Sequence, residues 1–249
     1  MDLTGVLQAG VYHVSRLVVA CPVAGALSLR AFNVPDLRAV PGGVLLAANH
    51  QSFLDPVLIG LVANVPLKYM ARRNLFAVPG FGMLVRALGA HPISRGTADT
   101  TALKTAMRLL RTGEKLLMFP EGTRTRDGRL GEFRPGVAAI AARCHVPILP
   151  VCVEGAFDSW PRTRALPRPA RVAVAFGEMM RTTGRDAAGL TRDLRAREKH
   201  LQSMLRGFLD SVTGRTPRAR HGNAPAWGRT VDREPEPSDG AATATGCPA

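Results

Sequence analysis

The sequence predicts an α/β fold: a largely parallel (mixed) central sheet flanked by helices, with an N-terminal membrane-associating helical segment. Between Gly42 and Gly177, short apolar runs alternate with helical stretches, a pattern that is typical of layered folds with parallel strands. The chain has 249 residues and is 46% hydrophobic, so it can bury the core of one ordinary domain. Wholesale disorder is therefore excluded.

The N-terminal segment, residues 1–35, is predicted to be helical and to lie in a membrane interface. An apolar stretch runs from Leu17 to Leu29, and at 1.5 Å per residue it reaches roughly 20 Å, short of the roughly 30 Å hydrocarbon core. The flanking Arg16 and Arg30 favour a helix pair on the membrane surface. The alternative is a helical hairpin packed on the protein's own core. A cleaved signal peptide is not expected, because Asp2 replaces a basic start.

Residues 36–213 are predicted to form the folded domain. Strands are expected at Val44–Ala48, Leu67–Ala71, His91–Ser94, Leu116–Phe119, Ile148–Val153 and Arg171–Phe176. Helices are expected at Pro56–Ala63, Phe81–Leu88, Thr97–Arg111, Gly136–Cys144 and Ala187–Val212. From residue 214 to 249 the chain is rich in Pro, Gly, Ala and Thr and poor in large aliphatic residues, which indicates a disordered tail.

Polar residues follow three of the expected strands directly. They are Asn49-His50, Ser94-Arg95 and Pro120-Glu121-Gly122. In parallel sheets, ligands collect beyond the carboxyl ends of the strands. The three segments are therefore expected to meet at one edge of the sheet, provided that the strands run parallel.

His50 and Asp55 are candidates for a general base and the acid that orients it. A neutral imidazole can take a hydroxyl proton, and a carboxylate on its other nitrogen fixes the tautomer and stabilises the imidazolium. Positions five apart on a helix point roughly 140° away from each other, so His50 must lie in a loop, with the helix beginning near Asp55. The alternative is that Asp55 only caps that helix, since Asp suits an N-cap and Pro56 the first helical position.

The segment that follows the expected strand Leu116–Phe119 has the features of an anion site. Gly122 permits close approach of a ligand, and Arg124 can hold a phosphate by a forked contact. Arg95 and Arg72 are candidates for further anion clamps, although a single arginine among so many is more often a solvated surface residue. Glu121 is better suited to orienting an arginine or the acceptor's hydroxyl than to binding phosphate.

The charge of the chain is strongly positive, with 33 Lys and Arg against 19 Asp and Glu and a net charge of +14. Such a surface attracts nucleic acid, anionic lipid or polyanionic cofactors. Only 5% of residues are aromatic, and no arginine–aromatic interleaving forms a platform on which bases could stack, so nucleic acid is not the expected partner. The six histidines are scattered without an H-x-x-x-H pair, and no metal site is expected.

Four blocks of the sequence resemble the motifs of the glycerolipid acyltransferases, the 1-acylglycerol-3-phosphate (lysophosphatidate) acyltransferase family, in the family's order. They are Asn49–Asp55 (the H-x-x-x-x-D box), Gly89–Arg95, Phe119–Thr125 (the F-P-E-G-T-R box) and Val146–Val151; Phe133–Gly136 also resembles the segment after the third box. The first box alone is weak, but all four in order are highly specific. Arg72 and Arg73 stand where many members have lysine, and His91-Pro92 replaces the usual apolar pair.

The resemblance implies the roles of individual residues. His50 would be the general base and Asp55 its partner. The predicted substrate-phosphate-binding residues are Arg72, Arg95, Glu121, Gly122, Thr123 and Arg124. The block from Val146 to Val151 would line the path of the acyl chain.

The resemblance also implies an activity. A fatty acyl group would move from acyl-CoA or acyl-carrier protein to the free hydroxyl of 1-acyl-sn-glycerol-3-phosphate, giving phosphatidate, without a cofactor or a metal. The expected partners are this lysophospholipid acceptor, the donor and an anionic membrane surface, with the protein peripheral or monotopic on the cytoplasmic face of the cell membrane. The alternatives are the same chemistry on a lysophospholipid, amino-acid lipid or glycolipid, or a non-catalytic basic module that binds membrane or nucleic acid.

Overall fold

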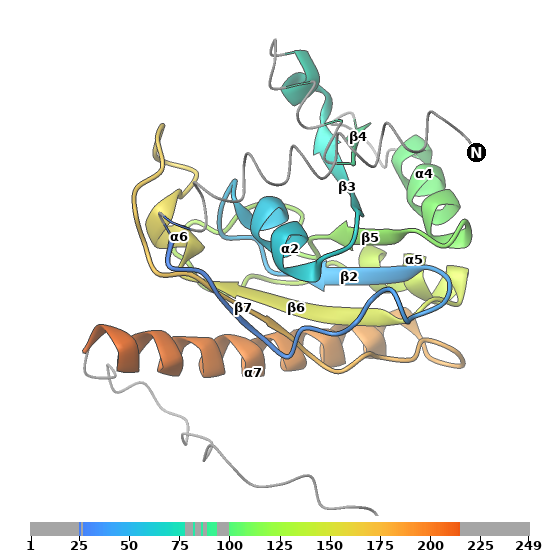
Figure 1. Cartoon of the computed structure of the whole chain (residues 1–249). Helices are drawn as coiled ribbons and strands as arrows, with labels where there is room; N and C mark the ends of the chain where they lie inside the picture. The colour runs from blue at the N-terminus through green and yellow to red at the C-terminus, as the bar shows by residue number, and fades with distance from the viewer. Residues whose placement is uncertain are drawn as a thin grey trace, which may run out of the picture. The chain divides into compact units, whose positions relative to one another are not determined.

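The computed structural model of the protein describes residues 25, 27–77, 82, 86, 89–93 and 100–214. All of them belong to one compact unit, Met1–Pro217. Its centre is a seven-stranded sheet in the order β1-β7-β6-β2-β5-β3-β4 (Figure 1). The strands are β1 (Arg30–Phe32), β2 (Val44–Ala48), β3 (Leu67–Arg72), β4 (Ala90–Ile93), β5 (Lys115–Met118), β6 (Ile148–Glu154) and β7 (Ala173–Phe176).

The predicted largely parallel, mixed sheet is confirmed. Strands β4, β3, β5, β2 and β6 are parallel neighbours, whereas β7 pairs with β6 in the antiparallel sense and β1 runs parallel to β7. Strand β2 lies between β5 and β6, and all five of its residues are buried. Its uninterrupted apolar run, Val-Leu-Leu-Ala-Ala, is the pattern of a strand that is covered on both faces.

The side chains of β2 alternate between two apolar cores. Leu46 and Ala48 pack in a core that includes residues of α2 (Asp55–Ala63). Leu45 and Ala47 pack in a core that includes residues of α4 (Thr100–Arg111), α5 (Gly136–Cys144) and α7 (Ala187–Thr213). Helix α2 therefore covers one face of the sheet, and the other three helices cover the opposite face, where α7 runs along the sheet (Figure 1).

The predicted elements agree with the described ones to within about two residues at most ends, and α5 is the same at both ends. Three elements were not predicted: β1, the 3-10 helix η1 (Arg73–Ala77) and the four-residue helix α6 (Ala156–Ser159). Strand β1 falls inside the segment 1–35 that was expected to be helical, so that expectation is wrong for its three residues. Sequence patterns need more than one period to be recognised, which a three-residue strand does not supply.

Several predictions fall outside the described residues. These are the membrane helices within residues 1–24, most of the helix expected at Phe81–Leu88 and the tail from residue 215 onward. Within the described part of the chain, no helix combines the length and apolar character needed to cross a bilayer.

Candidate active site

His50 and Asp55 are in direct contact in the loop that joins β2 to α2. Nδ1 of His50 lies 2.7 Å from Oδ2 of Asp55, whose side chain is fully buried. An ionised carboxylate only accepts hydrogen bonds, so Nδ1 carries the proton and Nε2 is the nitrogen that can take another. The same Oδ2 accepts hydrogen bonds from the backbone N–H groups of Gln51, at 2.6 Å, and Ser52, at 2.7 Å.

The alternative for Asp55, a role that only caps α2, is wrong. Helix α2 begins at Asp55 itself, its N-cap residue is Leu54, and no side chain caps it by a hydrogen bond. The carboxylate instead turns back to the loop and holds two of its amides and the imidazole. Asp55 thus orients His50 and fixes the loop around it.

The imidazole of His50 is held by stacking against Phe119, which directly follows β5. Its ring centroid lies 3.9 Å from that of Phe119, with 16° between the planes. The His50 side chain keeps 18% of its surface exposed. Stacking restricts the rotation of the imidazole, and part of the side chain remains exposed.

The neighbours of His50 fix the ends of the strands. The side-chain amide of Asn49, which is buried, donates to the backbone C=O of Val153 at 2.9 Å and accepts from the N–H of the same residue at 2.8 Å. This pair ties the carboxyl end of β2 to that of β6. Because both amide atoms are used, Asn49 has a structural part in the site.

Ser52 is excluded as a nucleophile by its contacts. The side chain is fully buried. Its Oγ donates a hydrogen bond to the backbone C=O of Trp160 at 2.8 Å and accepts one from the N–H of Leu54 at 3.2 Å. The hydroxyl therefore joins the catalytic loop to the end of α6.

Glu121, in the loop after β5, connects the two motifs. Its Oε1 accepts from the backbone N–H of His50 at 2.9 Å, and its Oε2 accepts from the N–H of Gly131 at 3.0 Å. Burial raises the pKa of the Glu121 carboxyl, and these two hydrogen bonds oppose the rise. With both oxygens on backbone amides, Glu121 positions the loop and is not directed at a phosphate.

The rest of this loop brings arginine side chains to the same edge. Gly122 has φ +67°, a conformation that glycine adopts without strain. A Cβ atom at Gly122 would lie 3.4 Å from Cζ of Arg134, so the Arg134 guanidinium packs over this glycine. The backbone N–H of Arg134 donates to the C=O of Pro120 at 3.0 Å, and its side chain is exposed.

Arg124, in the loop after β5, packs against Phe53 of the loop that joins β2 to α2. Its Cζ is 3.4 Å from the centroid of the Phe53 ring, a cation–π contact that holds the guanidinium flat. The N–H of Thr125 donates to the backbone C=O of His50 at 2.8 Å. Thr123, between them, is exposed. The imidazole and this guanidinium are thus on the same edge of the sheet, within two loops that are hydrogen-bonded to each other.

Two of the predicted site residues are not placed by the structure. Arg95 lies outside the described residues, and so does the side chain of Arg72, although its backbone ends β3. Sequence reasoning did not assign Phe119 or Arg134 to the site. Both belong to segments that were singled out for their resemblance, the box from Phe119 to Thr125 and the Phe133–Gly136 segment, so the available signal was their place in those segments.

A polar layer supports the catalytic loop on the α7 side of the sheet. Oε2 of Glu154 accepts from the side-chain amides of Gln51, at 3.0 Å, and Gln202, at 2.9 Å. Its Oε1 accepts from Nε of Arg206 at 3.0 Å, and Arg206 also donates to the C=O of Gly128 at 2.8 Å. Burial raises the pKa of Glu154, and Arg206 is the main opposing influence.

Glu198 of α7 is a second buried carboxyl beneath the site. Its side chain is fully buried, and within the described residues neither oxygen has a hydrogen-bond partner of normal geometry. Burial raises the pKa of Glu198 well above its usual range; the Glu121 carboxylate adds to the rise, and the nearby Asn49 backbone opposes it. The protonated form of Glu198 is therefore favoured by its surroundings.

Comparison with known proteins shows what this chain is similar to. The model of the family described as Acyltransferase matches residues 31–154. A chloroplastic 1-acyl-sn-glycerol-3-phosphate acyltransferase of Brassica napus is 36% identical over 110 residues, which are 43% of this chain and 32% of that protein. A chloroplastic protein of the same description from Arabidopsis thaliana is 33% identical over 128 residues, 49% of this chain and 36% of that protein.

These matches cover about a third of the length of the two plant relatives. The crystal structure of a 1-acyl-sn-glycerophosphate acyltransferase from Thermotoga maritima has the same fold, with a TM-score of 0.70 at 24% identity over 83% of this chain and 84% of that one. The family's matched segment begins in β1 and ends at Glu154, so it contains the strands that carry both loops of the site. Residues 31–154 of the chain therefore match the acyltransferase family, and the chain is similar to enzymes described as 1-acyl-sn-glycerol-3-phosphate acyltransferases.

Proposed function

We propose that the protein transfers a fatty acyl group from the thioester of acyl-CoA, or of acyl-carrier protein, to the free hydroxyl of 1-acyl-sn-glycerol-3-phosphate, giving phosphatidate. One observation carries the proposal: Nδ1 of His50 is held 2.7 Å from the buried Asp55 carboxylate, in a loop hydrogen-bonded to the arginine-bearing loop after β5. The names of the plant relatives support the choice of acceptor.

The proposed chemistry needs one base and no metal or cofactor. Nε2 of His50 takes the proton of the acceptor hydroxyl as its oxygen attacks the thioester carbonyl carbon. Asp55 stabilises the imidazolium that forms. The tetrahedral intermediate then collapses, the carbon–sulfur bond breaks, and the imidazolium returns its proton to the departing thiolate. The new ester and the free thiol balance the reaction.

The acceptor's phosphate is assigned to the guanidinium groups beside this base. Arg124 is oriented by Phe53, and Arg134 packs over Gly122 and is exposed. Guanidinium groups bind phosphate by forked, charge-assisted hydrogen bonds. Arg95 and Arg72 are retained as further phosphate ligands on sequence grounds.

The acceptor is a lipid, so the protein is proposed to work on an anionic membrane surface, at the cytoplasmic face of the cell membrane. The net charge of +14 supports attraction to anionic lipid. The apolar, arginine-flanked residues 17–29 are proposed to attach the protein to that surface.

The proposal is tested with the purified full chain and labelled acyl-CoA or acyl-carrier protein against a panel of acceptors. The panel contains lysophosphatidate, lysophosphatidylcholine, an amino-acid lipid and a glycolipid. We expect phosphatidate as the main product and no product from the His50→Ala variant. Preferred acylation of an acceptor without a phosphomonoester would reassign the substrate, and the absence of thioester consumption with every pair would overturn the proposal.

A further inference from the structure

The loop that follows α6, residues 160–171, is a cationic projection with an apolar tip. It contains four arginines and no acidic residue, and residues 162–169 are all exposed. The side chain of Leu166 is 75% exposed, more than that of any other large hydrophobic residue in the described part of the chain. In Figure 1 this loop, drawn in yellow and gold, extends away from the sheet beside α6 before it returns to β7.

Hydrogen bonds at its base give the 160–171 loop a defined shape. The hydroxyl of Ser159 donates to the C=O of Arg168 at 2.7 Å, and the N–H of Arg168 donates to the C=O of Ser159 at 3.1 Å. The indole Nε1 of Trp160 donates to the C=O of Arg164 at 3.1 Å. The loop is therefore closed at its neck like a compact surface loop, with Leu166 between the neck residues.

The charge of the loop is not neutralised by neighbouring acids. Within the described residues, neither Arg162 nor Arg164 forms an ion pair, and Arg168 donates to a backbone carbonyl, that of Asp158. Arginine side chains near an exposed leucine can spread their apolar stems along an interface and keep their charged ends in water. Such an arrangement is complementary to a partner that has an apolar interior and an anionic boundary with water.

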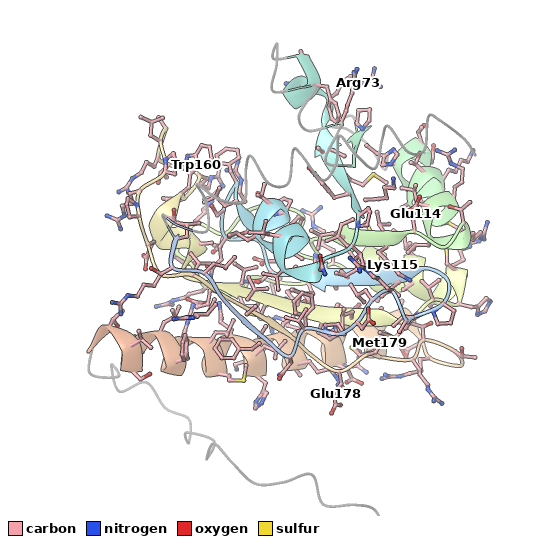
Figure 2. The ribbon with its side chains drawn as sticks, in the orientation of Figure 1. Arg73, Glu114, Lys115, Trp160, Glu178 and Met179 are labelled. Carbon is pink, nitrogen blue, oxygen red and sulfur yellow. The ribbon has the colours of Figure 1, made fainter. Side chains whose placement is uncertain are left out.

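The base of the loop touches the catalytic loop. The C=O of Trp160 accepts the hydrogen bond of Ser52, and the Trp160 ring lies 5.1 Å from that of Phe53, centroid to centroid. Phe53 is itself 42% exposed and carries Arg124 on its face. Trp160 is labelled in Figure 2 at the end of α6, where the projecting loop begins. A partner bound to the loop would thus sit beside the rim of the active site.

We propose that the 160–171 loop and Phe53 form a docking surface for an anionic lipid bilayer. Leu166 enters the boundary of the acyl chains, and Arg162 and Arg164 bind lipid headgroups. The proposal deepens the proposed function, because it states where the lipid surface meets the domain, in addition to the N-terminal segment. It can be tested separately from the proposed function, by a binding measurement that needs no catalysis.

The test measures the partition of the full chain onto vesicles of phosphatidylcholine alone and of phosphatidylcholine with about a third phosphatidylglycerol. A basic residue near an anionic surface is worth about fivefold in binding, so Arg162→Gln with Arg164→Gln should lower the partition onto anionic vesicles by about 25-fold. On neutral vesicles this double variant should bind like the parent chain. Leu166→Ser should lower the partition about tenfold on both kinds of vesicle.

Matched controls lie on the opposite face of the sheet. Arg143→Gln with Arg192→Gln makes the same charge change on exposed positions of α5 and α7, and Leu103→Ser removes an exposed leucine from α4. We expect both controls to bind within twofold of the parent chain. The proposal is overturned if the loop variants bind anionic vesicles as the parent does, or if the charge controls weaken binding equally.

Two further readouts separate this proposal from the proposed function and from a protein partner. Acylation of a short-chain, water-soluble lysophosphatidate should be unchanged in the loop variants, because none of them touches the base or the phosphate site. An inactive parent chain whose loop still binds anionic vesicles would overturn the proposed function alone. Unchanged vesicle binding, with turnover reduced only for the acidic carrier-protein donor, would assign the loop to that protein and overturn the lipid proposal.

Discussion

The backbone N–H of His50 donates a hydrogen bond of 2.9 Å to Oε1 of Glu121, although 71 residues separate the two in the chain. The C=O of the same histidine accepts a hydrogen bond from Thr125. The peptide groups of His50 are thus held on both sides by the loop after β5. The position of His50 therefore depends on the loop after β5 as well as on the loop that joins β2 to α2.

Replacing Glu121 by alanine should damage both stability and turnover. The change leaves the partly buried N–H groups of His50 and Gly131 without their acceptor, which should cost about 2–4 kcal/mol in the free energy of unfolding. The value of kcat should fall by at least tenfold, because His50 loses one of its anchors. Urea denaturation and steady-state kinetics measure the two effects.

Glu132→Ala is the matched control for this prediction, because the Glu132 side chain is 92% exposed. It should change the unfolding free energy by less than about 0.5 kcal/mol. A Glu121→Ala variant with the parent's stability and kcat would show that the link between the loops is dispensable.

Asparagine and alanine at position 55 should separate the two roles of Asp55. Asp55→Asn keeps an oxygen for the amides of Gln51 and Ser52 but cannot stabilise an imidazolium by charge, so kcat should fall about 10²–10⁴-fold while the melting temperature changes little. Asp55→Ala should lose the same activity and also about 2–3 kcal/mol of stability. Equal melting temperatures for the two variants would contradict the loop-fixing role.

Glu198 should make the stability of the protein depend on pH. Its pKa is raised above the ordinary value of 4.5 by burial, so the folded state binds a proton more tightly than the unfolded state. The unfolding free energy should therefore fall as pH rises from about 4.5 through the folded-state pKa, by at most about 1.4 kcal/mol per pH unit for this one proton.

Glu198→Gln keeps the shape of the side chain and removes its titration. The difference in stability between Glu198→Gln and the parent chain should grow in favour of the variant with increasing pH, as measured by urea denaturation between pH 5 and 8. Glu132→Gln, an exposed counterpart, should give a difference that does not vary with pH. A flat difference for Glu198→Gln as well would show that the pKa of this carboxyl is not raised in the folded protein.

Arg134 should act on acceptor affinity. If its guanidinium binds the acceptor's phosphate beside Gly122, Arg134→Ala should raise the KM for lysophosphatidate about 10–100-fold, the value of one charge-assisted hydrogen-bonded contact, with a smaller effect on kcat. Arg129→Ala, which removes a guanidinium that is 65% exposed, should leave KM within twofold. A KM within twofold of the parent for Arg134→Ala would remove this residue from the phosphate site.

The sequence predicted the local parts of the site well. An apolar run before Asn49-His50 and another before Pro120-Glu121 were sufficient to place both loops at the carboxyl ends of parallel strands, and β2 and β5 are in fact neighbours in the sheet. The contact between His50 and Asp55 was also predictable, because it spans five residues and requires only a loop in place of a helix.

The long-range contacts could not be predicted in the same way. Nothing in the sequence near Glu121 indicates that its two oxygens serve the amides of His50 and Gly131, because backbone N–H groups carry no residue signal. The same holds for the carbonyl of Trp160 that receives the Ser52 hydroxyl. The Asp-Pro pair also allowed Asp55 to act only as an N-cap; the donors within the loop bind its carboxylate instead.

The central claim is that the imidazole of His50 removes the acceptor's proton. The most direct measurement is single-turnover release of free CoA from labelled acyl-CoA in the presence of lysophosphatidate, for the parent chain and for His50→Ala with matching melting temperatures. The proposed mechanism predicts a rate at least about 10²-fold lower in the variant. A folded His50→Ala variant that releases CoA within tenfold of the parent rate would contradict it.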